Sequence, residues 1–460
     1  MPFMPQQFAS YAEAMDYLFT LTNYEKGFNF KPRTTPKLGL ERMSKLLESV
    51  GNPEKRLRAI HIAGTKGKGS TATMVANVLT AAGYRTGLYL SPHVEDVRER
   101  IQANGQWIPE AAVCEHLNRM YDYLRRSEVK ENGLYGPTFF EVFTAISFMY
   151  FESERLDFAV AEVGLGGRLD ATNVLSPLVC AITPVSMDHT ERLGDTLEAI
   201  AGEKAGIIKQ DVPVVCGPQQ PEALRVIEQT CRERSAPLYC WGRDFSAGKA
   251  PNDASFSIDT WAGSFGGIRL RMIGEHQALN AATAAAVVSV LKQTGQAQWS
   301  AEQLRGGLAS AFCPARVELV RQRPITIVDA AHNPASVQAL LGTLRASFNF
   351  DRLIFVFALA RDKDVSTILR LIAAEASHVV FTSMANPRAL TPEELGEKMQ
   401  QTGSDRFSVM PDLRQALLHA ETLAGPTGLV CVCGSFYLAG DARRLLAEAE
   451  QTHRRKSAIA

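Results

Sequence analysis

The feature that most constrains this chain is a glycine-rich loop, Gly64-Thr65-Lys66-Gly67-Lys68-Gly69-Ser70. Residues 58–63 before the loop predict a strand, and residues 69–82 after it predict a helix. In that setting glycines let backbone N–H groups point at phosphate oxygens, while the helix N-terminus and a lysine add positive charge. The loop therefore predicts an α/β protein that binds phosphate groups.

The spacing of the loop departs from the usual G-x-x-x-x-G-K-[ST] pattern. Ile62 stands where the first glycine belongs, and Gly69 follows Lys68 where serine or threonine is usual. A glycine-rich turn without a ligand is the alternative interpretation. The strand before the loop and the helix after it favour the phosphate site.

Strand-like and helical segments alternate along the chain, which predicts a largely parallel α/β sheet. Continuous apolar runs over 158–163 and 178–185 suit strands buried on both faces, and residues 139–151 suit an apolar helix. Within 242–272, short alternating segments among Gly, Ser and Asp predict a small antiparallel excursion. An alanine-rich helix is expected to follow over 280–293.

The α/β pattern restarts near Phe312. Further strand-like runs cover 325–329, 353–358, 378–382 and 429–433. We therefore expect two α/β domains: residues 1–311, a phosphate-loop domain with a mostly parallel sheet and the antiparallel excursion, and residues 312–460, a smaller Rossmann-like domain.

Charge and hydropathy exclude several classes of partner. The 49 basic and 49 acidic residues cancel, so bulk charge does not drive binding to nucleic acid or to an anionic membrane surface. No run reaches the roughly 18 apolar residues of a membrane span, and the first residues lack the pattern of a secretory signal. We expect a cytoplasmic protein that acts on small molecules.

The eight cysteines are scattered, and the two that are close, Cys431 and Cys433, lie in an apolar run. No second pair at zinc-ligand spacing accompanies them. We expect buried free thiols, as is usual in a reducing compartment.

Three polar residues lie at or beyond the ends of predicted parallel strands: Ser91, Glu162 and His189. Ligands of open α/β sheets bind at the carboxyl ends of the strands, and Mg²⁺ prefers oxygen ligands. One interpretation is that a carboxylate there holds magnesium beside the phosphates. The alternatives are a cap before Pro92 for the serine, a cap or salt bridge for the glutamate, and a surface or capping role for the histidine.

In the second domain, Asp329-Ala330-Ala331-His332-Asn333-Pro334 follows a strand. An acidic residue at such a turn can bind a ribose, as in dinucleotide-binding folds. No G-x-G-x-x-G accompanies it, which argues against a redox cofactor. A helix cap is the alternative.

Taken in order, the motifs of the chain form a series. They are Asn23-Tyr24-Glu25, Leu38 to Arg42, the phosphate loop, Ser91-Pro92-His93, Thr138 to Glu141, Glu162 to Asn173, Asp188-His189, Glu203 to Gly206, His276-Gln277 with Asn280 to Ala282, Pro314-Ala315-Arg316, Asp329 to Pro334, and Gly434 to Leu438. From about Tyr17 to Asp441 this series resembles the folylpolyglutamate synthase and dihydrofolate synthase family, within the larger group of Mur ligases.

The resemblance implies an ATP-binding, Mur-ligase-like domain over 1–311 and a C-terminal ligase domain over 312–460. It implies that the loop residues bind the ATP phosphates and that Lys68, His189 and Lys204 take part in catalysis. ATP would also contact Asn280, Arg316, Asp329 and His332. Two magnesium ions would be held by Ser91, Glu162, His189 and Lys204, the last as a carbamate.

The resemblance also implies a substrate site and a reaction. The pterin-bearing substrate would contact Thr138, Phe139, Phe140, Glu141, Leu169, Asp170 and Ala171. The implied enzyme is a monomer that uses ATP to add L-glutamate to folates through an acyl phosphate, and that also makes dihydrofolate from 7,8-dihydropteroate. The alternatives are another Mur-type ligase with a different acceptor and a non-catalytic nucleotide-binding regulator.

Four positions depart from the family pattern. Lys66 replaces an asparagine in the phosphate loop, and Leu90 stands where serine or threonine is common. Ala315 and Ala330 replace glycines. Alanine is small enough to be tolerated at both positions unless the backbone there needs a positive φ.

Overall fold

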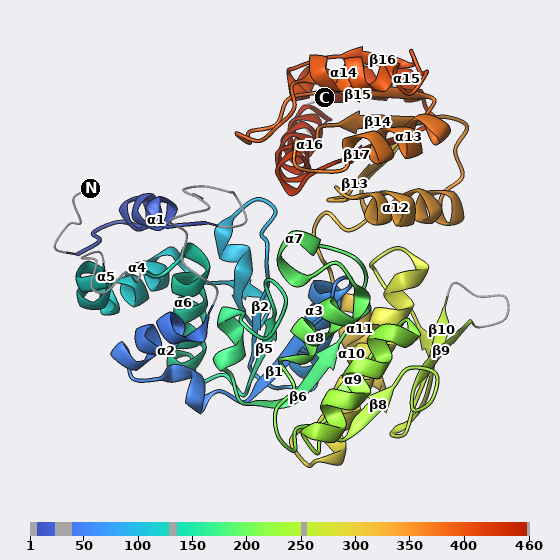
Figure 1. Ribbon diagram of the computed structural model, residues 1–460. Coiled ribbons are helices and arrows are strands. Elements are labelled where there is room, and N and C mark those ends of the chain that lie inside the picture. The colour runs from blue at the N-terminus through green and yellow to red at the C-terminus, as the bar shows by residue number, and fades with distance from the viewer. Residues whose placement is uncertain (1–6, 24–38, 128–135, 250–254, 458–460) are drawn as a thin grey trace. The chain divides into compact units, whose positions relative to one another are not determined.

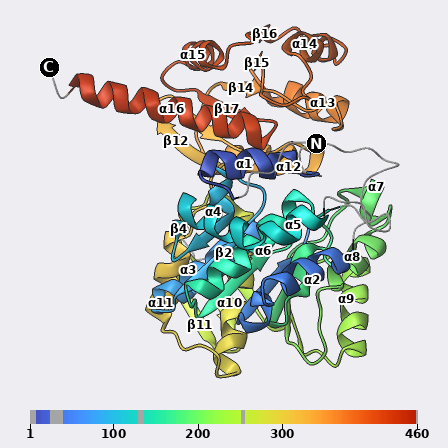
Figure 2. The ribbon, with the colours of Figure 1, turned by 90° about the vertical axis from the view of Figure 1, so that its left-hand side faces the viewer.

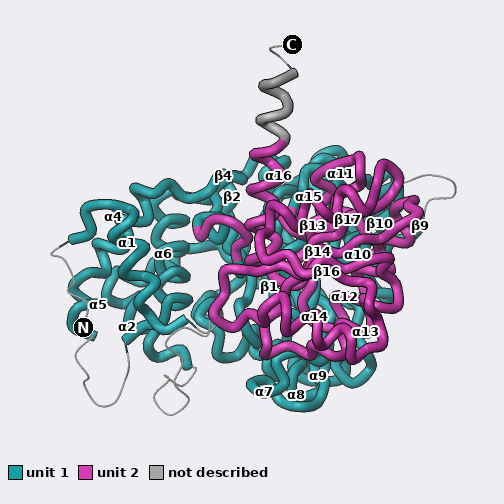
Figure 3. Tube along the Cα trace, turned by 90° about the horizontal axis from the view of Figure 1, so that it is seen from above, with its two compact units in different colours: residues 1–92, 98–271, 276–312 teal, residues 93–97, 272–275, 313–460 magenta. Residues whose placement is uncertain are grey.

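The computed structural model describes residues 7–23, 39–127, 136–249 and 255–457 (Figure 1). Tyr24, Glu25 and Leu38 of the sequence motifs lie outside this part of the chain. The chain divides into two compact units (Figure 3). Unit 1 comprises Met1–Pro92, Arg98–Arg271 and His276–Phe312, and unit 2 comprises His93–Val97, Met272–Glu275 and Cys313–Ala460. Unit 2 thus takes two short segments from within the sequence of unit 1.

Unit 1 is built on an eight-stranded sheet in the order β4-β3-β2-β5-β1-β6-β7-β8. Its parallel strands are β1 (Ala59–Ala63), β2 (Thr86–Tyr89), β5 (Phe158–Glu162), β6 (Pro177–Ile182), β7 (Val214–Cys216) and β8 (Leu238–Cys240). An antiparallel hairpin, β3 (Ile101–Ala103) and β4 (Gln106–Trp107), extends one edge. The predicted antiparallel excursion is confirmed as β9 (Ser246–Lys249), β10 (Phe256–Thr260) and β11 (Gly263–Ile268).

The helices of unit 1 surround this sheet. They are α1 (Tyr11–Thr20), α2 (Leu40–Ser49), α3 (Lys68–Ala81), α4 (Glu110–Arg119), α5 (Tyr121–Ser127), α6 (Phe139–Ser153), α7 (Thr190–Leu193), α8 (Leu197–Ala205), α9 (Pro221–Glu233), α10 (Glu275–Gln293) and α11 (Ala301–Ser310), with short 3₁₀ turns at Pro53–Arg56 (η1), Val97–Arg100 (η2) and Ala171–Val174 (η3). In Figures 1 and 2, α1, α2, α4, α5 and α6 gather on one side of unit 1.

Burial explains why the apolar runs became strands and helices. Every residue of β1 and of β5 is buried, as expected for central strands of a parallel sheet covered on both faces. Glycine allows α11 to approach α3 closely, since a Cβ on Gly307 would lie 2.4 Å from the Cα of Val78. These central elements form a rigid base for the loops at the carboxyl ends of the strands.

Unit 2 has a six-stranded sheet in the order β12-β13-β17-β14-β15-β16. The strands are β12 (Glu318–Gln322), β13 (Ile325–Val328), β14 (Leu353–Phe357), β15 (His378–Phe381), β16 (Phe407–Val409) and β17 (Leu429–Cys433), and all pairs are parallel except β12 with β13. One face packs against α12 (Pro334–Ser347), α13 (Val365–Glu375) and α14 (Pro392–Gln400), and the other against α15 (Leu413–Ala424) and α16 (Phe436–Ser457).

These observations confirm the predicted fold class of two α/β sheets. All eight cysteines are free thiols, and only Cys114 is partly exposed. In the described ranges, we find no helix that is both long and apolar enough to cross a membrane.

Candidate active site

The phosphate loop joins β1 to α3, and two of its glycines are required by the local geometry. Gly64 has φ +147°, and a Cβ there would fall 1.9 Å from Oγ1 of Thr183. Gly67 has φ +82° at the start of α3, and a Cβ there would fall 2.2 Å from Oδ1 of Asn280. Any side chain would therefore displace the loop, because both the backbone conformation and the space favour glycine.

Several contacts attach the loop to residues 183–188, which follow β6. The amides of Thr65 and Lys66 donate to the carbonyl of Pro184 at 3.0 and 3.1 Å. The hydroxyl of Thr65 accepts from the amide of Ser186 at 3.1 Å, and Lys66 Nζ lies 3.4 Å from Asp188 Oδ2. The first amides of α3 have no partner inside the helix, and are the donors that suit a phosphate.

The structure brings Lys68, Ser91 and Glu162 together. Glu162 ends β5, opposite Ile62 of β1, and is 5% exposed. Its Oε2 accepts the amide of Ser91 at 3.0 Å, and its Oε1 lies 3.9 Å from Nζ of Lys68. A buried carboxylate therefore lies between the lysine of the phosphate loop and the serine that follows β2.

These residues meet the needs of a magnesium ion in part. Glu162 and Ser91 offer the hard oxygen ligands that Mg²⁺ prefers, and the ion usually keeps waters and substrate phosphates as its other ligands. Across residues 7–23, 39–127, 136–249 and 255–457, no group of three or more His, Cys, Asp and Glu side chains is placed to hold a metal. The pair fits an ion that is held jointly with ATP.

His189 lies seven residues beyond β6, at the N-terminal cap of α7. Its backbone is left-handed (φ 51°) and its side chain is 49% exposed. The ring nitrogens lie 3.9 Å from carboxylate oxygens of Asp188 and Glu191. The histidine thus directly follows the segment 183–188 that contacts the phosphate loop, and two carboxylates lie near its ring.

Lys204 lies near the end of α8 and points at the phosphate loop. Its Nζ donates to the carbonyl of Gly64 at 2.9 Å, and the residue is 4% exposed. Burial lowers the pKa of this amine to about 7, and the charge of Lys68 acts in the same direction. A large fraction of the amine is therefore unprotonated at neutral pH.

Thr138 and Glu141, predicted to contact substrate, hold the start of α6. Each side chain accepts the other residue's amide, which forms a capping box. Arg42 of α2 also donates to both oxygens of Glu141, from Nη2 at 2.9 Å and Nε at 3.3 Å. All three residues are buried. Sequence reasoning missed Arg42 as their partner because it lies 99 positions away.

The two phenylalanines between them differ. Phe139 is buried and stacks on Phe143, with ring centroids 5.5 Å apart. Phe140 is partly exposed and faces Gly164, where a Cβ would lie 2.5 Å from its Cζ. Phe140 is therefore the member of this motif that keeps a surface for a ligand.

Asp170 closes the glycine-rich turn after β5. Its Oδ2 accepts the amide of Leu165 at 2.9 Å, and its Oδ1 accepts the amide and hydroxyl of Thr172 at 3.0 and 2.5 Å. The hydroxyl of Thr172 also lies 2.8 Å from Nε2 of His61 in β1, which the sequence did not single out. Burial lowers the pKa of His61 to about 3, so the ring is neutral. Leu169 is partly exposed and Ala171 is buried.

Asn280 of α10 completes the arrangement under the phosphate loop. Its Nδ2 donates to Oε1 of Gln277 at 3.0 Å, which fixes the amide plane against Gly67. Both residues are buried.

In unit 2, Asp329 follows β13 and holds a turn. Its two oxygens accept the amides of Val317 and Ala331 at 2.8 and 2.7 Å. Burial raises the pKa of this carboxyl, whereas the charge of Arg316 lowers it. Asn333, not Asp329, caps α12.

The residues after this turn surround an aromatic ring. The guanidinium of Arg316, an exposed residue, lies 5.1 Å from the centroid of Phe436. The ring of His332 is 5.9 Å from the same centroid, and its Nδ1 is 2.7 Å from the carbonyl of Ala330. We call Arg316, His332 and Phe436 the aromatic platform. Sequence motifs alone assigned no particular role to Phe436.

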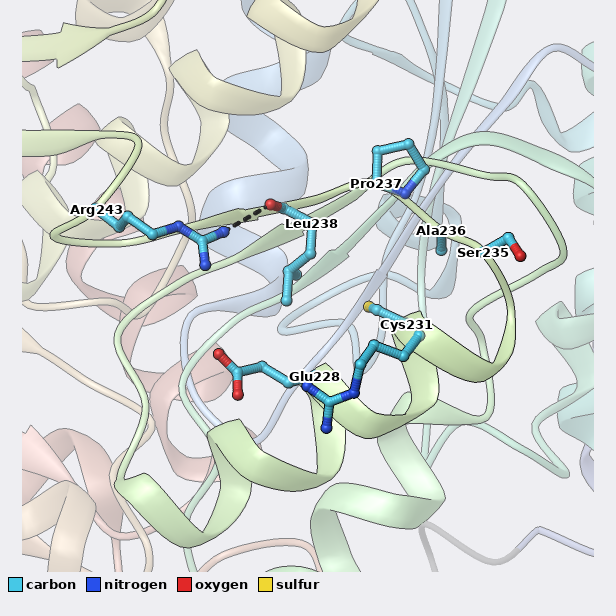
Figure 4. Close-up of a pocket in the computed structure, with 8 residues that line it drawn as sticks. Glu228, Cys231, Ser235, Ala236, Pro237, Leu238 and Arg243 are labelled. Carbon is cyan, nitrogen blue, oxygen red and sulfur yellow. Dashed lines mark hydrogen bonds between the residues drawn. The ribbon is translucent and has the colours of Figure 1, made fainter.

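A hollow elsewhere on unit 1, of about 380 Å³, lies at α9 and β8 (Figure 4). Arg243 at its rim donates to the carbonyl of Leu238 at 2.8 Å and to Asp244 at 2.9 Å. These bonds hold the turn after β8. None of the predicted site residues lines the hollow.

Comparison with known proteins decides which family this arrangement represents. The Mur ligase middle domain matches residues 136–288, and the Mur ligase, glutamate ligase domain matches residues 315–436. The chain is 37% identical over 414 residues to the dihydrofolate synthase/folylpolyglutamate synthase of Bacillus subtilis. The aligned region covers 89% of this chain and 95% of that protein.

The chain belongs to the folylpolyglutamate synthase and dihydrofolate synthase family.

Solved members of this family share the fold. A Mycobacterium tuberculosis folylpolyglutamate synthase complexed with ADP and AMPPCP superimposes with a TM-score of 0.82 at 36% identity, covering 89% of this chain and 95% of that one. Escherichia coli FolC in complex with DHPP and ADP gives a TM-score of 0.84 at 30% identity, covering 97% of this chain and 100% of that one.

The structure bears on three departures from the family pattern. Ala315 has φ +52°, so alanine there adopts a conformation that costs about 1 kcal/mol relative to glycine. Ala330 is not among the residues with positive φ, and alanine fits there without backbone strain. Lys66 pairs with Asp188, beside His189.

Proposed function

We propose that this protein is an ATP-dependent ligase that adds L-glutamate to folates, and that it also joins glutamate to 7,8-dihydropteroate. The observation that carries the proposal is that Lys68 and Ser91 meet the buried carboxylate of Glu162 at the strand ends beside the phosphate loop. The relatives named for both activities and the solved structure with DHPP support the second acceptor.

In the first step, the substrate carboxylate attacks the γ-phosphorus of ATP. The bond to the bridging oxygen breaks, ADP leaves, and an acyl phosphate forms. The ammonium of Lys68 and the first amides of α3 stabilise the negative charge that develops on the transferred phosphoryl group. The amides of Thr65 and Lys66 donate to the carbonyl of Pro184 and so hold the loop in place. Lys68 and the first amides of α3 are therefore already oriented toward the phosphate position.

Bound Mg²⁺ would supply positive charge that neutralises phosphate oxygens. We propose that Glu162 and Ser91 hold it, with His189 near a second ion. Glu162 supports this assignment because its Oε2 accepts the amide of Ser91 while its Oε1 faces Lys68.

In the second step, the amine of L-glutamate attacks the acyl carbon. Inorganic phosphate leaves, the nitrogen loses a proton, and an amide bond remains. No enzyme side chain needs to become acylated. Phe140 and Leu169, which stay partly exposed next to the glycine-rich turn, are the best placed of the predicted substrate residues to contact the acceptor.

We also propose that Lys204 is carbamylated. The unprotonated amine attacks carbon dioxide, a C–N bond forms, and one proton is released, which leaves an anion able to bind a second Mg²⁺. The lowered pKa and the burial of Lys204 support this, because a carbamate needs a neutral amine and protection from acid. Intact-protein ¹³C NMR in labelled bicarbonate would show one carbamate signal, absent in Lys204→Met.

For the nucleotide, we propose that Asn280 and the aromatic platform contact ATP. Asp329 supports the platform, since its buried carboxylate joins the amide of Val317, next to Arg316, to the amide of Ala331 after β13. The exposed surface of the Phe436 ring suits the base of the nucleotide, and the guanidinium of Arg316 beside it suits an anionic group.

The direct test measures ADP release with glutamate, first with dihydropteroate and then with tetrahydrofolate as acceptor. We expect both to stimulate turnover. Stimulation by tetrahydrofolate alone would limit the enzyme to chain extension. Stimulation by a cell-wall precursor, with neither folate active, would assign the chain to another Mur ligase, and ATP binding without any turnover would indicate a regulator.

A further inference from the structure

Residues 93–97 follow Ser91 almost directly and yet belong to unit 2, where they pack against α16. The contact is close because α16 has a glycine there. A Cβ on Gly440 would lie 2.2 Å from the carbonyl oxygen of Val94. Only Pro92 separates the serine of the proposed magnesium site from this segment.

Arg443, one turn further along α16, fixes the segment by charge. Its Nη1 pairs with Glu95, and its Nε donates to Oε2 of Glu318 at 2.6 Å. The Arg443 side chain is only 20% exposed and that of Glu318 only 10%. One guanidinium therefore joins two carboxylates that are more than 200 positions apart in the sequence. The planar fork of arginine permits this, whereas the single ammonium of lysine does not reproduce it.

The second carboxylate leads to the nucleotide residues of unit 2. The same Oε2 of Glu318 accepts the amide of Ala315 at 2.8 Å. The carbonyl of Ala315 in turn accepts the amide of Ala330 at 3.0 Å. Arg316 follows Ala315 directly, so the ion pair with Arg443 helps to fix the turn that presents Arg316.

The same helix also carries the third part of the platform. Phe436 begins α16, and Arg443 lies seven residues, or two turns, later, on the same side of the helix. Arg443 is thus linked to Phe436 through helix α16. Its ion pair with Glu318 links it to the turn that carries Arg316, and its ion pair with Glu95 links it to the segment that follows Ser91.

We propose that Arg443 is a positioning residue for ATP and magnesium, acting on Ser91 through residues 93–97 and on Arg316 through Glu318. The proposal rests on the proposed function, because it assigns a role within that ligase reaction. Arg443 is not among the residues assigned to ATP, magnesium or the acceptor, so its loss should weaken the orientation of the site without removing a reacting group.

The test compares Arg443→Met with Arg444→Met, a matched control on the same helix. Arg444 is 63% exposed and pairs with Asp441 within α16. For Arg443→Met we expect the KM for ATP and the half-saturating Mg²⁺ concentration to rise together by about 3- to 30-fold, the range seen for mutations in coupled networks. The KM for glutamate should not change. Calorimetric titration with ADP and Mg²⁺ should show the same loss of affinity without turnover.

Arg443→Lys should recover part of the ATP affinity, since one of the two ion pairs can form. A purely structural role would lower the melting temperature of Arg443→Met while leaving its KM for ATP and its Mg²⁺ dependence unchanged well below that temperature. That result would overturn the proposal, as would equal effects in Arg444→Met.

Glu95→Gln provides a second route if Arg443→Met does not fold. It keeps the pair of Arg443 with Glu318 and weakens only the hold on residues 93–97. We expect it to raise the half-saturating Mg²⁺ concentration more than the KM for ATP, and unchanged Mg²⁺ dependence would contradict the proposal. Absence of turnover in the wild-type enzyme with every acceptor would instead reject the proposed function.

Discussion

The phosphate-loop site of unit 1 and the aromatic platform of unit 2 are built in different ways. In unit 1 the backbone is decisive, because the glycines at 64 and 67 fill spaces that admit no Cβ, and Glu162 and Lys204 are buried beside the loop. In unit 2, partly exposed side chains meet around one ring, and Ala315 tolerates a left-handed backbone. The arrangement in unit 1 suits the stabilisation of charge that develops during the reaction. The arrangement in unit 2 suits nucleotide binding whose affinity side-chain changes can adjust. Substitutions should therefore affect turnover in unit 1 and nucleotide affinity in unit 2.

The largest effect should come from Lys68→Ala. Removing the cation at the transferred phosphate should lower kcat by at least about 100- to 1,000-fold, the loss typical of one transition-state donor. The melting temperature should change little, since Lys68 is not part of a core. Lys45→Ala, which removes an exposed lysine paired with Glu41, is the control for a general charge effect. Wild-type turnover in Lys68→Ala would contradict the view that unit 1 supplies the charge stabilisation for turnover.

The phosphate loop should not accept alanine at position 67. Gly67→Ala combines a positive φ with a collision at Asn280, whereas Gly83→Ala has a similar φ (+92°) and open space. Both should lose about 1–2 kcal/mol of stability from the backbone alone. Only Gly67→Ala should also lose affinity for an ATP analogue, by about tenfold or more, measured by calorimetry. Equal affinities would show that backbone shape does not decide binding in unit 1.

The two regions should also differ in the pH dependence of their buried charges. The pKa of Lys204 is lowered to about 7 in the folded state. Between that value and the ordinary lysine value the unfolded chain binds more protons, so folding stability rises with pH. From pH 7 to 9 the gain is about 2 kcal/mol. Denaturant titrations in carbon-dioxide-free buffer should show it in wild type and not in Lys204→Met.

For Asp329 in unit 2 the sign is opposite. Its pKa is raised, so the folded state binds more protons than the unfolded chain at pH values between the ordinary and the raised value. The penalty for burying this carboxylate is therefore relieved as pH falls through that window.

Arg316→Met tests the aromatic platform. The expected change is a rise of about two- to fivefold in the KM for ATP, equivalent to one exposed cation–π contact, with kcat nearly constant. Arg414→Met, at an exposed pair with Glu448, serves as the control. A large loss of kcat in Arg316→Met would place part of the charge stabilisation in unit 2 and remove the distinction between the two regions.

The smallest effect is expected at Ala315. Ala315→Gly relieves the positive φ, whereas Ala330→Gly removes a methyl group at a position with ordinary φ. The first variant should be more stable than the second by about 1 kcal/mol, with equal KM for ATP. Thermal unfolding of the two variants measures the difference.

Local patterns were enough to predict much of the fold. The glycine loop with its strand and helix, the apolar helix that begins at Phe139, and the strands on which Glu162 and Asp329 depend all follow from periodicity over a few residues. Short or edge elements, such as β4 (Gln106–Trp107) and β16 (Phe407–Val409), carry too few residues for a pattern and were not predicted.

Contacts between distant residues could not be predicted in the same way. The bonds of Arg42 to Glu141 and of Arg443 to Glu318 join positions 99 and 125 residues apart, and nothing local indicates the partner of either arginine. His61 is similar, because a histidine in an apolar strand shows no sign of the threonine that it meets. Sequence motifs predicted the candidate site, but these partners determine which motif residues keep an exposed surface and which support the fold.

The buried thiols give each unit its own reporter of opening. Cys180, Cys216, Cys231 and Cys240 share one core of unit 1, and Cys431 and Cys433 share the core on one face of the sheet of unit 2. A modifying reagent reaches such a sulfur only when the surrounding core opens, so the rate of labelling follows the equilibrium of that opening. Mass spectrometry of the labelled peptides would then rank the two units by local stability in a single sample.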